Sequence, residues 1–231
     1  TYLWDMDIWS DGTYNYLAVA TDLDVFVLRD QLLSEWVDYE LNVQVKGTND
    51  RIAREVRFAP DFGTSELLWA VVAEDAARAG GNPWAVGDLF LTSADTPAQW
   101  GQVFEEVAFE NYATNYEVDT RFVDIEFDPG YSTQYPQLYV AIASDRYDDD
   151  EVGNLYYVYG ESSTTGPGDM ESGYIFFEDQ ALGTVEVSGN TIMVQNSWTG
   201  DVYVTNDAGN SWPLAKRSPA GNFWGQLYMH P

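Results

Sequence analysis

The sequence predicts an all-β fold, namely a β-propeller of about four blades of antiparallel sheet. Strand patterns recur along the chain in four similar units, and Gly, Pro, Asp or Asn turns separate the strands within each unit. The units are spaced by roughly 40 to 70 residues, the range expected for propeller blades that carry loop insertions. With 231 residues, of which 45% are hydrophobic and 16% aromatic, the chain is large enough to bury the core of one β-rich domain.

Each unit is expected to begin with an outer strand, a turn and an inner strand that is apolar on both faces. In the second unit these strands are residues 56–62 and 67–73, and in the third they are 125–131 and 138–143. Residues 6–12 with 16–20, and 185–190 with 192–194, repeat the order in the first and fourth units. The approximate repeats of this single domain are therefore 1–54, 55–122, 123–184 and 185–231.

Two forms of the propeller fit this pattern. Either the C-terminal strand pairs with the first blade and closes a small ring, or the units belong to a propeller of seven or eight blades. The first residues already have a strand pattern and no signal peptide precedes them, so we expect a processed product or a piece of a longer chain. No apolar run approaches 18 residues, so no membrane span is expected.

Residues 202–212, which read VYVTNDAGNSW, form the most informative motif of the chain. A strand of alternating apolar residues enters a turn, and Thr205, Asp207, Gly209, Ser211 and Trp212 fit the pattern S/T-x-D-x-G-x-T/S-W. Asp207 is placed to accept hydrogen bonds from turn amides, and Gly209 can adopt the positive φ that closes the turn. The Trp212 indole can then fold back over the hairpin and bury a large apolar surface.

This pattern resembles the Asp-box, or BNR repeat, the signature of sialidase-like and related exported β-propellers. A second, partial match follows the apolar residues 89–91: Ser93, Asp95 and Trp100 fit the pattern, while Pro97 and Gln99 replace the glycine and the hydroxyl residue. The resemblance implies a propeller fold. In those families the box lies away from the catalytic face, so the resemblance implies no activity.

Tryptophans at the hairpin returns are expected to be core residues. These are Trp36, Trp100 and Trp212, each of which follows a strand and a turn. Trp84 and Trp198 instead lie in polar loops. Those two indoles can either pack under their own loops or stack on a sugar ring or a protein partner.

The chain is strongly acidic, with 38 Asp and Glu against 10 Lys and Arg and a formal net charge of -28. Such a charge repels nucleic acid and anionic membranes, and no basic patch offsets it. The plain interpretation is a solvated acidic surface. The sharper one is calcium binding at Asp145, Asp148, Asp149, Asp150 and Glu151, because Ca²⁺ prefers hard carboxylate oxygens, although their spacing matches no EF-hand loop.

Enzyme chemistry has few candidates in this sequence. There is no cysteine, and the one histidine, His230, is next to the last residue, so a Ser-His-Asp triad or a zinc site is not expected. A sialidase-like or endoglucanase-like glycoside hydrolase would need two converging carboxylates, and the sequence does not single out a pair. Eight arginines leave room for a sialidase-type triad, but Arg57 lies within a strand pattern that suggests surface or edge pairing rather than an anion clamp.

We therefore predict an extracellular or cell-surface propeller that is structural or adhesive and contacts proteins or glycans. Self-assembly is among the expected interactions, and calcium is the candidate cofactor. The alternative is a secreted glycoside hydrolase with paired carboxylates. A central cleft with convergent carboxylates and a half-buried Arg or Trp would favour the hydrolase, whereas a plugged centre would favour the structural role.

Overall fold

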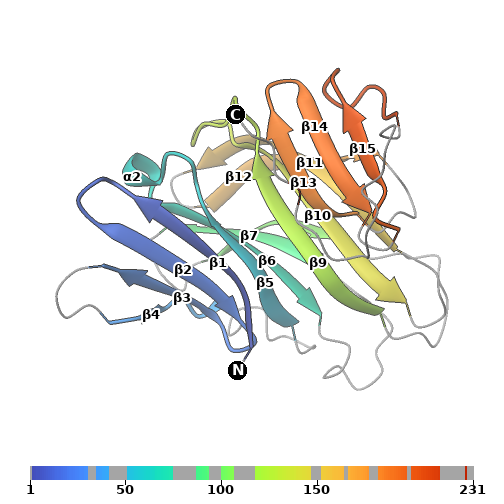
Figure 1. Ribbon diagram of the computed structural model, residues 1–231. Helices are drawn as coiled ribbons and strands as arrows, with labels where there is room; N and C mark the ends of the chain where they lie inside the picture. Colours follow the sequence, from blue (N-terminus) through green and yellow to red (C-terminus); the bar gives the residue numbers. More distant parts are fainter. Residues whose placement is uncertain are drawn as a thin grey trace.

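The computed structural model of the protein describes residues 2–30, 35–41, 51–74, 87–93, 100–106, 118–146, 152–163, 166–176, 182–196, 199–213 and 227. These residues form an all-β fold, which confirms the predicted class. The strands make four antiparallel sheets that follow one another along the chain (Figure 1). No helix in this described part is long and apolar enough to cross a membrane.

The first two sheets each contain four strands. Sheet 1 consists of β1 (Leu3–Ser10), β2 (Asn15–Thr21), β3 (Val25–Arg29) and β4 (Val37–Asp38). Sheet 2 consists of β5 (Arg51–Phe58), β6 (Leu67–Glu74), β7 (Gly87–Ser93) and β8 (Gly101–Glu106). One helical turn, α2 (Phe62–Ser65), connects β5 to β6.

The last two sheets repeat this arrangement. Sheet 3 consists of β9 (Val118–Phe127), β10 (Gln137–Arg146), β11 (Val152–Ser163) and β12 (Gly166–Phe176). Sheet 4 consists of β13 (Leu182–Ser188), β14 (Thr191–Asn196) and β15 (Val202–Thr205). Within every sheet, strands that are neighbours in sequence pair with each other, so each sheet is a simple meander.

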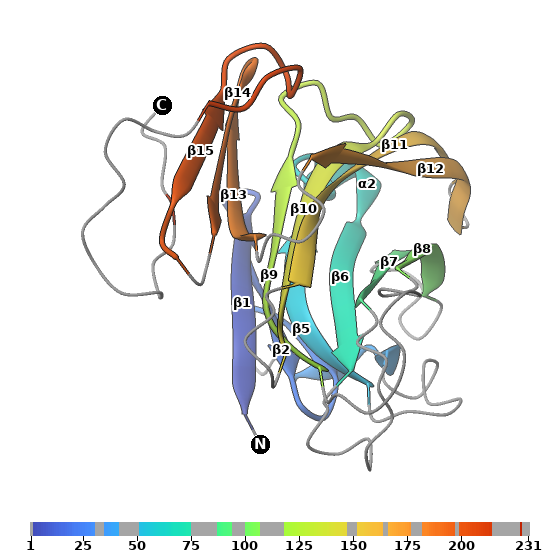
Figure 2. The same ribbon diagram turned by 90° about the vertical axis from the view of Figure 1, so that its right-hand side faces the viewer.

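The first strands of the four sheets lie in a series. Strand β5 packs between β1 and β9, and β9 packs between β5 and β13. In the turned view of Figure 2, β1, β5 and β9 run along one side of the molecule, while β7, β8 and β12 lie away from them. Because β1 and β13 occur at the two ends of the series, one face of sheet 1 and one face of sheet 4 have no neighbouring sheet among the described strands.

Three apolar clusters fill the spaces between successive sheets. Sheet 1 meets sheet 2 around Ala18, Val27, Val56 and Leu68. The second cluster contains Trp69 and Leu138 and joins sheets 2 and 3, and the third contains Leu155 and Val194 and joins sheets 3 and 4. Full burial of each large side chain contributes roughly 1.5–3 kcal/mol, so sheet-to-sheet packing is the main source of stability.

Two details of the strand prediction need correction. The strand at 56–62 was expected on the outside, but Val56 is fully buried because β5 is sandwiched between β1 and β9. The inner strand at 67–73 is buried on both faces, as predicted, with Trp69 and Ala70 both inaccessible. The expected repeat boundaries at 54/55, 122/123 and 184/185 fall inside β5, β9 and β13, because the apolar patterns begin after the polar first residues of these strands.

Candidate functional site

A pocket of about 290 Å³ opens between sheet 1 and α2. Its lining residues come from sheet 1 and its connecting segments and from the α2 turn, and four of them are aromatic; they include Trp9, Tyr16, Arg29, Tyr39, Phe62 and Glu66. Strand alternation places Trp9 on the face of β1 that is turned toward sheet 2, where it pairs across the ladder with Tyr16 on β2. The helical turn α2 then brings Phe62 against both rings, with centroids 5.2 Å from Trp9 and 5.3 Å from Tyr16.

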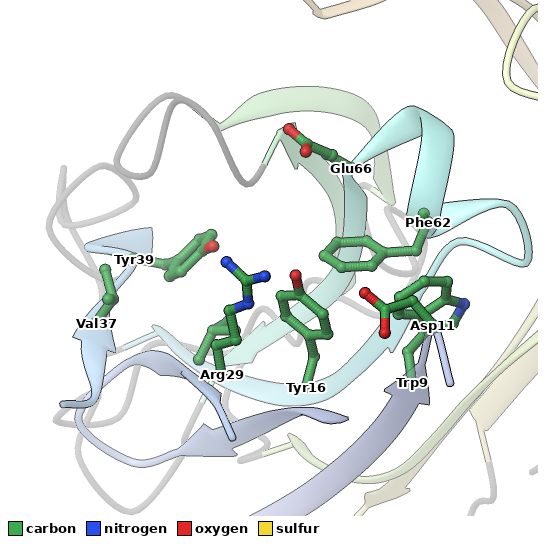
Figure 3. A pocket seen from close by; sticks show the side chains of 10 residues that line it. Trp9, Asp11, Tyr16, Arg29, Val37, Tyr39, Phe62 and Glu66 are labelled. Carbon is green, nitrogen blue, oxygen red and sulfur yellow. The ribbon is translucent and has the colours of Figure 1, made fainter. Parts of the chain in front are cut away.

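Arg29 supplies the positive charge of this pocket. Figure 3 shows its guanidinium pointing into the middle of the pocket, between Tyr39 on one side and Tyr16 on the other. The guanidinium carbon lies 4.1 Å from the ring centroid of Tyr14 and 5.5 Å from that of Tyr16. Its Nε is buried and has no hydrogen-bond partner among the described residues. The group is therefore held by stacking, and its terminal nitrogens point into the pocket.

Asp11 lies at the rim of the pocket, in the turn that connects β1 to β2. Its Oδ1 accepts hydrogen bonds from the amides of Thr13 and Tyr14, each at 2.7 Å, and Gly12 closes the turn with φ of 82°. Those amides, and to a smaller extent Arg29, lower the pKa of the Asp11 carboxyl. The carboxylate is therefore ionised at neutral pH and can accept hydrogen bonds from a ligand.

Gly63 gives the Trp9 indole its room. A Cβ atom at position 63 would lie 2.7 Å from Cη2 of Trp9 and 2.9 Å from its Cζ2, which is too close for two carbon atoms. The glycine is thus required by the position of the indole rather than by its own backbone conformation. Replacing it would displace Trp9 and change the shape of the pocket.

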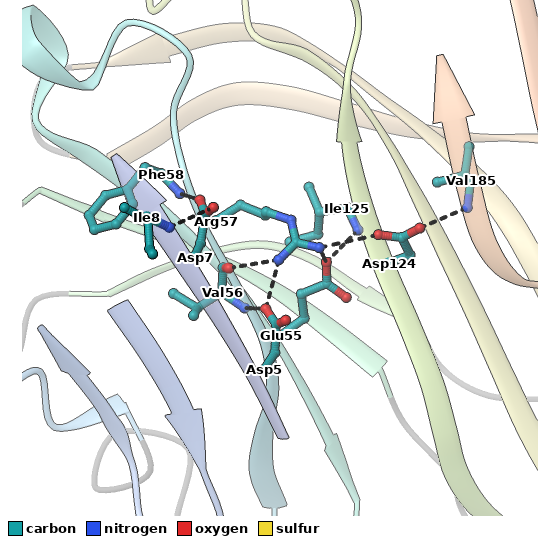
Figure 4. Close-up of polar contacts among 10 residues, drawn as sticks. All are labelled: Asp5, Asp7, Ile8, Glu55, Val56, Arg57, Phe58, Asp124, Ile125 and Val185. Carbon is teal, nitrogen blue, oxygen red and sulfur yellow. Dashed lines mark hydrogen bonds and ion pairs between the residues drawn. The ribbon is translucent and has the colours of Figure 1, made fainter. Parts of the chain in front are cut away.

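A second polar cluster lies where the first strands meet (Figure 4). Arg57 on β5 is its centre, with Nη1 2.8 Å from Asp5 and Nη2 2.8 Å from Glu55 and 3.4 Å from Asp124. The Arg57 side chain is only 20% exposed. Arg57 is therefore not a surface residue. It pairs with carboxylates from the edge strands of three neighbouring sheets, namely β1, β5 and β9.

The same carboxylates bind the backbone of the next sheet. Asp5 accepts a hydrogen bond from the Val56 amide at 3.1 Å, and Asp124 accepts one from the Val185 amide at 2.9 Å. Glu55 accepts one from Ile125 at 2.9 Å. Each of the first three sheets is thus fixed to the following one by a carboxylate on its first strand, which we call the junction carboxylate.

Burial changes the acidity of this cluster. It raises the pKa of Glu55 and of Asp7, and it raises the pKa of Asp124 to about 6, although hydrogen bonds and the Arg57 guanidinium oppose these rises. Burial, followed by the nearby charges of Glu186 and Asp124, raises the pKa of Glu126 to about 8. Glu126 is therefore largely protonated at neutral pH.

The loop after β15 places the five motif residues in one hydrogen-bonded unit. Asp207 Oδ1 accepts from the Ser211 amide at 3.0 Å, Asp207 Oδ2 accepts from the Ser211 hydroxyl at 2.7 Å, and the Thr205 hydroxyl donates to Asp207. These hydrogen bonds lower the pKa of Asp207 to about 2. Gly209 has φ of 90°, and its carbonyl accepts a hydrogen bond from the Trp212 indole at 3.0 Å.

The hairpin tryptophans have two different environments. Trp212 is buried against sheet 3, in the cluster with Leu155, and Trp100 is buried against sheet 1, where its indole donates to the Tyr39 carbonyl at 2.7 Å. Both are core residues, as predicted. Trp36 is 47% exposed, so the expectation that it is core is wrong. The physical reason is position: Trp100 and Trp212 pack on the preceding sheet, and the described chain has no sheet before sheet 1.

Several predicted site residues lie outside the described residues. These are Asp95, Trp84, Trp198, Asp148, Asp149, Asp150 and Glu151. Ser93 is the last residue of β7, and Asp145 lies near the end of β10. Among the described residues, no group of three or more His, Asp or Glu side chains is arranged to hold a metal ion.

Sequence reasoning missed the pocket and the Arg57 cluster. The signal for the cluster was present, because Asp5-Met6-Asp7, Glu55-Val56-Arg57 and Asp124-Ile125-Glu126 occupy the same place in three repeats. Alternation puts all of these charged side chains on one face of their strands. Charged residues at matching positions on buried strands indicate contacts between the repeats.

Comparison with known proteins does not place the chain in a family. No protein-family model matches the sequence, and no curated protein matches it. Among the solved structures that are similar, one is the polysaccharide lyase Uly1, with a TM-score of 0.43 and 13% sequence identity. The similarity covers 96% of this chain and 50% of the lyase chain, so the chain spans about half the length of that protein.

Proposed function

We propose that this chain is a non-catalytic extracellular binding module built from propeller blades, and that it holds a glycan in the pocket between sheet 1 and α2. The observation that carries the proposal is the Arg29 guanidinium, which points into a pocket that Trp9, Tyr16, Tyr39 and Phe62 help to line. Adhesion to glycans or glycoproteins at a cell surface is the role that this site supports best.

Four successive meander sheets with adjacent first strands support the propeller part of the proposal. The loop at 205–212 supports it too, since its hydrogen bonds and its buried indole are those that an Asp-box motif requires. In this interpretation each sheet is one blade. The acidic composition and the lack of cysteine suit an exported protein that stays soluble without disulfides.

The chemistry of the pocket matches a sugar ring. Aromatic faces such as those of Trp9 and Tyr16 pack against the C–H groups of a pyranose, whereas neutral and charged polar groups at the rim fix its hydroxyls. Arg29 offers donors and Asp11 offers an acceptor, so both kinds of hydrogen bond are available. The volume suits one sugar residue, the end of a chain or a branch.

A glycan array followed by titration calorimetry tests this proposal. We expect Trp9→Ala and Arg29→Gln to weaken binding of the selected glycan at least tenfold. Gly63→Ala should also weaken it, by displacing the indole, while leaving the charges in place. Tyr135→Ala is the matched control, because that tyrosine is exposed and lies outside the pocket. Absence of glycan binding, or binding that none of the three pocket variants affects, would refute the proposal.

A secreted glycoside hydrolase is the second candidate function, and one observation favours it. Glu126 has a pKa of about 8, which suits a general acid at neutral pH, and the Glu186 carboxyl contributes to that rise. Binding remains the stronger proposal, because Asp5, Glu55 and Asp124 are already committed to amides and to Arg57.

Hydrolysis of a glycan panel separates the two candidates. If the chain is a hydrolase, Glu126→Gln should abolish turnover while Trp9→Ala mainly changes the Michaelis constant. If it is a binding module, no member of the panel is cleaved by the wild type, although some are bound. Turnover that is lost in Glu126→Gln would overturn the non-catalytic proposal.

Calcium binding at Asp145 and the acidic residues that follow it stays a proposal that rests on the sequence. A melting scan with and without EDTA tests it, with Asp148→Asn/Asp150→Asn as the variant. A bound calcium ion predicts a lower melting temperature in EDTA for the wild type and no effect of EDTA on the double variant. An equal melting temperature with and without EDTA would exclude it.

A further inference from the structure

The outer face of sheet 1 is apolar and uncovered. On β1, Met6 and Ile8 point away from sheet 2, because Asp5, Asp7 and Trp9 point toward it. Across the ladder, Met6 pairs with Val19 and Ile8 pairs with Leu17, so the apolar surface continues onto β2. We call this surface, with Met6, Ile8, Leu17, Val19, Phe26 and Leu28, the back face of sheet 1.

The equivalent residues of the other sheets are buried. Val56, Ile125 and Val185 correspond to Met6, since they directly follow the residues that align with Asp5 in the other three sheets. Each of the three is 0–1% exposed. Met6 is 58% exposed and Ile8 65%. Sheet 1 thus has the composition of a covered face, and a patch of this kind marks an interaction site.

Exposed Trp36 extends the patch. It directly precedes β4, as Trp100 directly precedes β8. Trp100 packs on the sheet before its own, and Trp36 has the same place in its sheet. The missing neighbour of Trp36 is therefore a sheet of the same type as those in the chain.

Sheet 4 lies at the other end of the series and has the other face without a neighbouring sheet among the described strands. Three junction carboxylates, Asp5, Glu55 and Asp124, each accept a hydrogen bond from the next sheet's first strand. Thr184 occupies the corresponding position in sheet 4, immediately before Val185. In the single chain its Oγ1 is buried and has no hydrogen-bond partner among the described residues, so the side chain has to turn outward to meet a second copy. At the junctions within the chain, the donor to this position is the amide of Val56, Ile125 or Val185 on the next sheet. The equivalent amide in sheet 1 is that of Met6.

We propose that sheet 4 of one copy of this chain packs on the back face of sheet 1 of a second copy, head to tail. The contact reproduces the three sheet-to-sheet junctions within the chain, with the Thr184 hydroxyl accepting a hydrogen bond from the Met6 amide of the second copy. Both halves of the contact are on the same polypeptide, which favours a second copy over an unrelated partner. The inference is independent of the glycan pocket, whose residues face the junction between sheets 1 and 2.

The net charge of -28 opposes this association, because two copies repel each other. The Debye length falls from about 8 Å at physiological ionic strength to about 3 Å at 1 M salt. An apolar contact between two acidic copies should therefore strengthen with salt, whereas a contact held by ion pairs between opposite charges would weaken.

Sedimentation velocity over a range of protein concentrations, at 0.15 and 1 M NaCl, tests the proposal. We expect the wild type to sediment faster as its concentration rises, and more so at the higher salt concentration. Ile8→Lys should abolish the association without lowering the melting temperature of the monomer, since Ile8 is exposed there. Tyr135→Lys is the control at a similarly exposed aromatic away from both faces, and it should behave as the wild type.

Thr184→Val separates the interface from folding. In the monomer, valine removes an unpaired buried hydroxyl, so the melting temperature should stay equal or rise. In the assembly, valine removes an accepted hydrogen bond, so the dissociation constant should increase several-fold. A wild type that sediments as a monomer under all conditions would overturn the proposal, as would an association that Ile8→Lys leaves intact.

Discussion

Individual residues of this protein divide into those that hold sheets together and those that face solvent or the pocket. Arg57 belongs to the first group, because it bridges carboxylates from three sheets. Removing one member of such a half-buried cluster leaves other charges uncompensated, and breaking buried pairs in this way costs several kcal/mol. Arg29 belongs to the second group, since its guanidinium is stacked and not paired with a carboxylate in any described ion pair.

Glu126 leads to a prediction about pH. Its pKa is about 8 in the folded chain, against 4.5 for an ordinary glutamate. Between these two values the folded state keeps a proton that the unfolded state has lost, so this residue makes stability fall as the pH rises from about 4.5 to about 8. Glu126→Gln cannot lose that proton. We expect the variant to be more stable than the wild type at pH 8 by about 1 to 3 kcal/mol, and equal to it below about pH 4.

Urea unfolding at several pH values measures this effect. Glu35→Gln is the matched control, because Glu35 is exposed and the substitution replaces the same carboxyl group by an amide. A difference between Glu126→Gln and wild type that does not change with pH would contradict the prediction.

Asp207 gives a second prediction, with the opposite sign. Hydrogen bonds lower its pKa to about 2, from an ordinary value of 3.8. The stability that it contributes is therefore present above about pH 4 and is lost as the pH falls toward 2. Asp207→Asn should lower the melting temperature at pH 7, and the difference from wild type should shrink as the pH approaches 2. A difference that stays constant down to pH 2 would show that the loop is not held by the ionised carboxylate.

At the scale of the elements, a hairpin tryptophan is buried only where another sheet precedes its own and can pack against the indole. Trp100→Ala and Trp212→Ala each remove a buried indole, and we expect each to cost about 3–5 kcal/mol. Trp36→Ala removes an exposed indole and should change stability by no more than about 0.5 kcal/mol at protein concentrations where the chain is monomeric. Chemical denaturation monitored by circular dichroism measures all three. Equal losses in the three variants would contradict the assignment of Trp36 as exposed.

The sequence was sufficient to predict strands and turns, because apolar alternation and Asn, Asp or Gly turns are local signals. It also identified Trp100 and Trp212 as core residues. It misjudged Trp36, since burial of that indole depends on a sheet that the described chain does not provide. It missed the pocket because Trp9, Arg29 and Phe62 belong to three separate segments, and only sheet-to-sheet packing brings them together.

The whole molecule carries far more negative than positive charge, and this determines how it responds to salt. Repulsion among the acidic groups is stronger in the compact state than in the unfolded chain, so screening should stabilise the fold. We expect the melting temperature to rise by a few degrees between 0.05 and 0.5 M NaCl, as measured by calorimetry at low protein concentration. A fall over that range would mean that attractive surface ion pairs outweigh the net charge.

The position of Arg57 also bears on how a chain of near-identical sheets reaches its correct order. If β1 docked directly onto β9 and skipped β5, Asp5 and Asp7 would meet Asp124 and Glu126 with no cation between them. Correct docking instead gives Asp5, Asp7 and Asp124 the guanidinium or an amide as a partner. A single basic residue in the second sheet thereby penalises misassembly in which one repeat is left out, a hazard common to proteins made of tandem units.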